Sequence, residues 1–173
     1  MPRVPYIEEA EHPELAPLIA RIKAERGKVL DLYKVLLHSP AVMEGWLSLF
    51  TAIRQKTKLA GRYRELAILR VAVLNGADYE YRAHLPFALK EGVNEQQIAA
   101  LKAWQDSSLF DAAERAVLAY TDAMTREVQV AEVVFEQLRE HFDAQDLVEL
   151  TATIAGYNLV SRFLEAMQIH RQS

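Results

Sequence analysis

Apolar residues recur every three or four positions along most of this 173-residue chain, which is the spacing of amphipathic helices. Residues that stop or start helices stand between these runs, notably Gly27, Ser39 with Pro40, and Asn75 with Gly76. The pattern predicts an irregular arm over residues 1–12. It predicts helices over 13–25, 29–37, 40–58, 64–74, 78–90, 95–104, from 111 onward, over 132–141 and over 145–170.

The composition supports an all-α fold. Leu, Ala and Glu dominate, and the chain has only six glycines and six prolines. Because no repeat, low-complexity segment or linker interrupts the pattern, we expect one compact domain over residues 1–173. The last predicted helix is apolar over 147–167, more than a lone domain of this size needs. We therefore expect part of it to pack against another subunit.

Charge and hydropathy limit the kinds of partner and the cellular location that we expect for this chain. A net charge of −4 argues against nucleic acid or an anionic membrane as the main partner. No segment approaches the roughly 20 apolar residues that a membrane-spanning helix needs. The first residues lack the apolar core of a signal peptide, so we expect a cytoplasmic protein.

The most decisive negative feature is the absence of cysteine. Within this sequence there can be no disulfide, no thiolate nucleophile and no thiolate-bound metal. Mechanisms that rest on thiol chemistry are therefore excluded for this chain.

The candidate chemistry follows the most continuously apolar stretch. Residues 64–74 are apolar on nearly every face, which predicts a central helix surrounded by others. The next predicted helix places Glu80 and His84 four residues apart, so a carboxylate and an imidazole share one face. Pro86 removes a backbone hydrogen bond next to His84. The alternative interpretation is an ordinary surface ion pair beside a harmless kink.

Glu65 adds a third ionisable group at the start of the central helix. Because this helix is predicted to be buried, the carboxylate of Glu65 needs an ion-pair or hydrogen-bond partner. Three arginines are close in sequence: Arg62, Arg64 and Arg70. Pairing with one of them is one solution. In the other, Glu65 meets His84 from the neighbouring antiparallel helix and orients the imidazole for acid–base chemistry.

Three stretches resemble the carboxymuconolactone decarboxylase and alkylhydroperoxidase D-like superfamily, over about residues 40–168. They are Arg64 to Asn75 continuing through Tyr79, Glu80 and His84; Glu114 to Tyr120; and Glu149 with Tyr157, Asn158, Arg162 and Phe163. The resemblance implies an all-α fold, assembly into trimers or hexamers, and a site close to the contacts between subunits.

The resemblance also implies site residues. The peroxidase branch uses a Cys-x-x-Cys pair, a histidine four residues after the second cysteine, and an upstream glutamate. The matching positions here are Ala77, Glu80, His84 and Glu65. Since both thiols are missing, disulfide exchange cannot operate. The decarboxylase branch is similar in having a glutamate four residues before that histidine and in lacking the cysteines, whereas the Arg-Glu-Leu context of Glu65 looks more like the peroxidase branch.

Three further residues are candidates for binding a substrate. Asn158 and Arg162 share one face of the last predicted helix, where the arginine could bind a carboxylate. Helix packing and a salt bridge to Glu165 or Glu149 are the alternative roles. Tyr81 could line a pocket or be a half-buried packing residue. No cofactor is expected, and nothing in the spacing of the carboxylates and the histidine demands a metal.

These features predict a decarboxylase-like lyase or isomerase that acts on a small molecule such as a carboxylated lactone. His84 would be the general acid or base, Glu80 would share the proton or face the substrate, and Glu65 would orient His84. Two alternatives stay open. One is a thiol-free relative of the alkylhydroperoxidase branch with an external reductant. The other is a ligand-binding or scaffold oligomer without catalysis.

Overall fold

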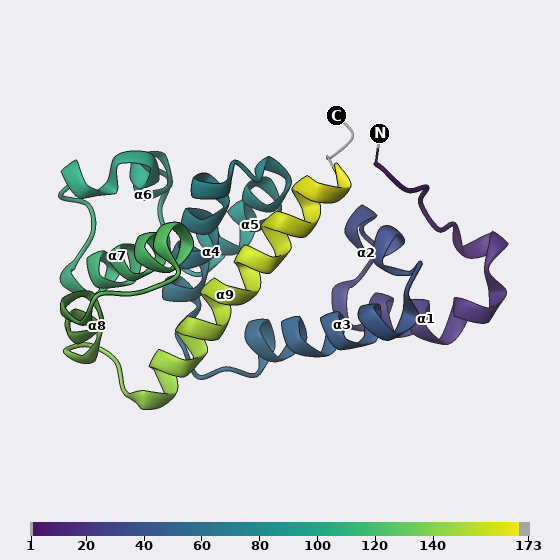
Figure 1. Ribbon diagram of the computed structural model, residues 1–173, viewed down its shortest axis with the longest axis horizontal. Helices are drawn as coiled ribbons and strands as arrows, with labels where there is room; N and C mark the ends of the chain where they lie inside the picture. Colours follow the sequence, from purple (N-terminus) through teal and green to yellow (C-terminus); the bar gives the residue numbers. More distant parts are fainter. Residues whose placement is uncertain (1, 170–173) are drawn as a thin grey trace. The chain divides into compact units, whose positions relative to one another are not determined.

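The computed structural model describes residues 2–169, which form an all-α fold as predicted, without strands among those residues. The elements are η1 Glu9–Glu11, η2 Pro13–Leu15, α1 Ala16–Arg26, α2 Asp31–Leu36, α3 Pro40–Gln55, α4 Gly61–Asn75, α5 Asp78–Lys90, α6 Glu95–Ala100, η3 Leu101–Asp106, α7 Ala112–Glu127, α8 Glu132–Arg139 and α9 Ala144–Met167 (Figure 1). Residue 170, the predicted end of the last helix, lies outside the described residues. None of the described helices has the length and apolar character to cross a membrane. The cytoplasmic location stays a prediction.

The chain divides into two compact units. Of the described residues, the first contains 2–57 and 164–169, and the second contains 58–163. Helix α9 therefore contributes its residues up to 163 to the second unit. The single domain expected from the sequence stays a prediction.

The first unit is built from α1, α2 and α3. Met43 and Leu47 of α3 are fully buried in it. The buried guanidinium of Arg26 adds polar contacts, because it donates to the Tyr33 hydroxyl at 3.0 Å and to Thr51 Oγ1 at 2.7 Å. Arg26 thus joins the end of α1 to both α2 and α3.

Helix α4 is the centre of the second unit and packs against α5 and α7 (Figure 1). All its residues from Leu66 to Ala72 are at most 2% exposed, which confirms the predicted central helix. Gly76 ends α4 in the left-handed conformation (φ 66°, ψ 24°), which glycine adopts without steric cost. The short turn that follows folds α5 back along α4 and so brings the first turns of α4 near the middle of α5.

The apolar core of the second unit gathers residues from α4, α5, η3 and α7. Its buried members are Leu66, Leu69, Ala88, Val93, Leu101, Trp104, Phe110 and Leu118. Each large side chain that is fully buried contributes about 1.5–3 kcal/mol relative to an exposed position. This cluster holds α5 against α4 and thereby fixes where the ionisable residues of the two helices meet.

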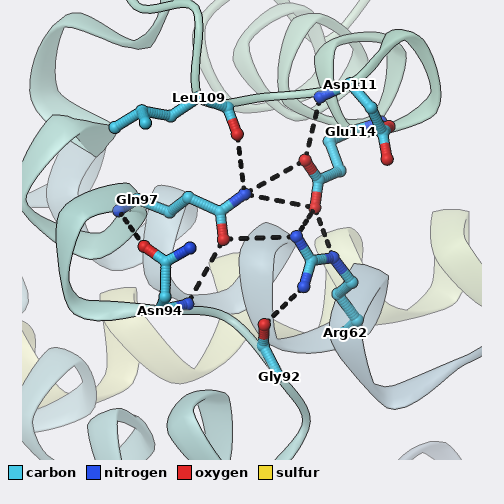
Figure 2. A network of polar contacts seen from close by, with 7 residues as sticks. All are labelled: Arg62, Gly92, Asn94, Gln97, Leu109, Asp111 and Glu114. Carbon is cyan, nitrogen blue, oxygen red and sulfur yellow. Dashed lines mark hydrogen bonds and ion pairs between the residues drawn. The ribbon is translucent and has the colours of Figure 1, made fainter.

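A polar network joins the start of α4 to the starts of α6 and α7 (Figure 2). Asn94 and Asp111 are the N-caps of α6 and α7, and each forms a capping box with the third residue of its helix, Gln97 and Glu114. Arg62 links the two boxes, because it forms an ion pair with Glu114 and donates to Gln97 Oε1 at 3.2 Å. The network fixes the beginnings of three helices at once.

Removing the carboxylate at this junction should destabilise the fold strongly. We expect Glu114→Ala to lower the free energy of unfolding by about 3 kcal/mol, because Arg62 and Gln97 lose a buried charged partner. Urea unfolding measures this change. Glu136→Ala is the control, since Glu136 and Arg139 form an exposed pair at 2.9 Å that is worth less than about 1 kcal/mol. Equal losses in the two variants would contradict the role given to the network.

Candidate active site

Helices α5 and α9 bring together the first part of the candidate site. Ser161 Oγ donates to Glu80 Oε2 at 3.0 Å, and the Tyr157 ring stands edge-on to the His84 ring with centroids 4.9 Å apart. The four-residue step from Glu80 to His84 is thus matched by the four-residue step from Ser161 back to Tyr157. One face of α5 lies on one face of α9, and the carboxylate and the imidazole lie along this contact.

Glu65 of α4 completes the group. Its Oε2 lies 2.8 Å from His84 Nδ1, and the two side chains are only 2% and 8% exposed. An ionised carboxylate can only accept hydrogen bonds, so Nδ1 of the imidazole carries the hydrogen of this contact. The other ring nitrogen, Nε2, is not part of this contact. The contact is the one that the sequence analysis gave as the second solution for Glu65.

The first solution is present as well. Arg64 Nε donates to Glu65 Oε1 at 3.3 Å, so the two oxygens of one carboxylate meet two different partners. The other two arginines are engaged elsewhere: Arg62 with Glu114, and Arg70 with Asp122 at 2.5 and 2.8 Å.

Opposing effects act on the pKa of the Glu65 carboxyl. Burial, the largest single effect, raises it, because the charged form loses hydration. The hydrogen bond and charge of His84 and the charge of Arg64 act together in the other direction. The net result is a pKa below the ordinary value of 4.5. Glu65 is therefore a carboxylate at neutral pH.

Asn158 and Arg162 form a second row on α9, next to Tyr157 and Ser161. Asn158 accepts hydrogen bonds at Oδ1 from Asn75 at 3.1 Å and from Arg162 at 2.8 Å, and it donates to Thr125 Oγ1 at 3.0 Å. The amide is thus held on both sides, and it positions the exposed guanidinium of Arg162. Among the residues that the structure describes, no carboxylate lies within ion-pair distance of Arg162, so the alternative salt bridge is not formed there.

Tyr81 faces the core instead of this group. Its ring is partly buried against the apolar cluster of the second unit, and burial raises its pKa. The packing alternative named for it is therefore present, and its role in substrate binding stays a prediction.

Tyr157 and Ser161, which contact His84 and Glu80, had no predicted role. A signal was available. The two residues repeat the four-residue step of Glu80 and His84, and Tyr157 belongs to one of the stretches that carry the family resemblance. What the pattern lacked was the pairing of α5 with α9. Within residues 2–169 no cluster of three or more histidine, aspartate or glutamate side chains is arranged to hold a metal ion.

Comparison with known proteins shows the family to which the chain belongs. Residues 40–123 match the model of the carboxymuconolactone decarboxylase family. The uncharacterized protein YdfG of Bacillus subtilis is 31% identical over 106 residues, which cover 60% of this chain and 72% of YdfG.

Two solved structures show the same fold. One is a protein of unknown function from Agrobacterium tumefaciens, described as a candidate antioxidant defence protein AhpD. It is 25% identical, with a TM-score of 0.74 over 79% of this chain and 94% of that one. The other is a peroxidase-related protein with an alkylhydroperoxidase AhpD core from Ralstonia eutropha, 20% identical, with a TM-score of 0.84 over 99% and 93% of the two chains. The fold is thus of the alkylhydroperoxidase D-like class. The chain belongs to the carboxymuconolactone decarboxylase family, as a member without the cysteine pair.

The lowered pKa of Glu65 makes the stability of the protein depend on pH in a defined direction. A carboxyl whose pKa is lower in the folded state stabilises the fold above its unfolded pKa, near 4.5, and loses this contribution as the pH falls through the folded value. Glu65→Gln should cost about 2 kcal/mol at pH 7, and the difference from wild type should shrink between about pH 5 and pH 3. Urea unfolding at several pH values measures it. Glu44→Gln, on the exposed face of α3, is the control, and a difference for Glu65→Gln that stays constant with pH would refute the assignment.

Proposed function

We propose that this chain is a small-molecule lyase or isomerase of the decarboxylase type, with His84 as its general acid and base. The observation that carries the proposal is the buried 2.8 Å contact between Glu65 Oε2 and His84 Nδ1. A carboxylate that holds one ring nitrogen fixes the tautomer and the ring orientation, and so prepares the other nitrogen for proton transfer.

The reaction needs proton transfer and stabilisation of an enolate. In an isomerisation, His84 Nε2 takes a proton from a carbon beside a carbonyl group, the electron pair moves onto the carbonyl oxygen, and the proton returns at another carbon. In a decarboxylation, the bond between the carbon and the carboxylate breaks and carbon dioxide leaves. The electron pair again forms an enolate, which the imidazolium protonates at carbon. Neither sequence of steps uses a thiol.

Glu80 is the second group of this proposal. It lies on the same face of α5 as His84, is only 2% exposed, and accepts a hydrogen bond from Ser161. In this position it would share the proton with His84 or face the substrate. Because it stands one helical turn away, the two groups can act on neighbouring atoms of one small molecule.

Arg162 suggests what the substrate carries. Its exposed guanidinium donates to Asn158, and no ion pair with a carboxylate of the described residues is formed there. A guanidinium of this kind binds a carboxylate well. A carboxylated lactone, with a carbonyl group for enolate formation and a carboxylate for Arg162, fits both parts of the proposal.

A second candidate function has one observation in its favour, the likeness to one protein described as a candidate antioxidant defence protein AhpD and to another described as peroxidase-related. Without a cysteine, turnover of a hydroperoxide would need an external reductant and another group to reduce the peroxide bond. A ligand-binding protein without catalysis is the third possibility. The experiment described next distinguishes both alternatives from the proposed lyase or isomerase.

Exchange of carbon-bound hydrogen with solvent tests the proposal without knowledge of the natural substrate. Unsaturated lactones with a carboxylate, and β-keto acids, are incubated with the protein in deuterated water, and proton NMR follows exchange and loss of carbon dioxide. We expect His84→Asn to lower the rate about 10²- to 10⁴-fold, because Asn keeps a donor near Glu65 but cannot exchange protons. Glu80→Gln should also lower the rate.

The control for these variants is His141→Asn, the same substitution at an exposed histidine of the second unit, which should keep the wild-type rate. Full activity in His84→Asn would overturn the proposal. Consumption of hydroperoxide by the pure protein without added thiol would replace it with the peroxidase alternative. Ligands that raise the melting temperature of wild type without exchange or decarboxylation would replace it with the binding alternative.

We also propose that two or more copies of this chain pair through α9, as a trimer or hexamer. Val148 and Leu159 are 68% and 47% exposed, and the exposed Ala152 and Ala155 lie between them at four- and three-residue steps. This spacing is that of a seam between two packed helices, and its small residues allow close approach. This seam would pack against the same seam of a second copy of the chain.

A charge in the seam should separate the subunits. We expect Leu159→Glu to shift the mass measured by light scattering after size exclusion from an oligomer to a monomer, because a carboxylate would lose its hydration in the interface. Val133→Glu is the control, since Val133 is 67% exposed on a different helix, α8. A wild-type protein that is monomeric at all concentrations would rule out this assembly.

A further inference from the structure

Three charged contacts lead from the edge of the second unit to the buried imidazole. Glu91 Oε1 lies 3.7 Å from Arg64 Nη2, Arg64 Nε donates to Glu65 Oε1 at 3.3 Å, and Glu65 Oε2 meets His84 Nδ1 at 2.8 Å. The exposed fraction of the side chain falls from 37% at Glu91 to 12% at Arg64 and 2% at Glu65. The carboxylate of Glu65, which contacts His84, is therefore also held by Arg64.

We propose that Arg64 is a positioning residue for His84. It holds Oε1 of Glu65, so that Oε2 is presented to the imidazole, and Glu91 restrains the far end of the guanidinium. The catalytic consequence rests on the proposed function, because only an acid–base role makes the charge state of His84 matter for turnover. The positioning itself does not depend on any reaction.

The physical reason is the charge balance of a histidine that gains and loses a proton. When His84 is protonated, it neutralises Glu65. When His84 is neutral, the buried carboxylate would be left without a counter-charge, which is costly and would favour protonation of Glu65. Arg64 keeps its charge at every accessible pH. It therefore lets Glu65 remain an ionised acceptor in both states of the imidazole.

Gly61 supports this arrangement from the first residue of α4. A Cβ at this position would overlap the carboxylate of Glu91. Only a residue without a side chain leaves room for Glu91 to lie across the start of α4 and reach Arg64. The carboxylate also lies at the end of the helix where the dipole favours negative charge.

The charged and titratable groups around the Glu65–His84 pair in the second unit come from three helices. They are Arg64 on α4, Glu80 on α5, Glu91 just beyond α5, and Tyr157 on α9. Arg64 is the cation of the second unit that contacts Glu65. Loss of the Arg64 charge should therefore raise the pKa of the Glu65 carboxyl.

The test is an NMR titration of the carboxyl carbon of Glu65 and of the ring nitrogens of His84 in labelled full-length protein. In Arg64→Gln we expect the midpoint for Glu65 to rise by about one pH unit or more, because a nearby opposite charge lowers a carboxyl pKa by about 1–3 units. We expect the Nδ1-protonated form of neutral His84 to become less populated. Arg64→Lys keeps the charge without the planar fork and should give a smaller change.

Arg82→Gln is the matched control. Arg82 forms an exposed pair with Asp78 at 2.8 Å on α5, and its loss should leave both signals unchanged. Gly61→Ala should displace Glu91 and broaden the Nε–H signal of Arg64. If Arg64→Gln lowers the melting temperature but leaves the Glu65 midpoint and the His84 tautomer as in wild type, Arg64 only ties two helices together and the proposal is overturned. This readout needs no substrate, so its failure is distinct from a failure of the proposed function.

Discussion

The charges along helix α4 impose the constraint on which the second unit depends. The helix is buried on nearly every face, and a buried charge is costly unless a partner and hydrogen bonds accompany it. Glu65 and Arg70 each meet this requirement with a residue of another helix, His84 and Asp122, and the half-buried Arg62 pairs with the buried Glu114 of α7. Each pair fixes how α5 or α7 lies on α4. The candidate site is one of these pairs, so its geometry is set by the requirements of burial.

Features that depend on local chemistry could be predicted from the sequence. The end of α4 at Gly76 and the capping residues Asn94 and Asp111 follow from patterns within a few positions, whereas α4 begins at Gly61, three residues before the predicted start. The partner of Glu65 could not be predicted in this way, because a helical pattern shows which face a residue occupies but not which helix covers that face. In the structure both proposed partners are present, because Arg64 contacts one oxygen of the Glu65 carboxylate and His84 contacts the other.

The contacts of α9 show why the rest of the site could not be predicted. Two rows of residues at four-residue spacing lie next to each other on this helix. Asn158 and Arg162 suggested chemistry by their residue types. Asn158 contacts Asn75 and Thr125, and Arg162 donates to Asn158. The row that meets the acid–base pair is Tyr157 with Ser161. A rotation of about 100° per residue separates the rows, and only the tertiary packing shows which of them faces α5.

Tyr81 makes the same point on α5. It lies about 100° round the helix from Glu80 but only about 60° from His84, so the helical phase alone leaves it close to the pair. Its ring packs against the apolar cluster that includes Leu66 and Trp104. The side of α5 that the core needs is therefore adjacent to the side that carries the ionisable groups. Residue types alone do not mark the boundary between them.

The two positions that match the missing thiols explain how one fold can serve two kinds of chemistry. Ala77 is 1% exposed and offers no reactive group, whereas Glu80 places a carboxylate one turn before His84. A thiol pair exchanges electrons, but a carboxylate can only gain or lose a proton at ordinary potentials. The Glu65–His84 pair, in contrast, is useful to either chemistry, because both need a histidine of fixed tautomer. The residues at these two positions therefore limit the reaction class that the proposed site can support, while the contact between Glu65 and His84 orients the imidazole.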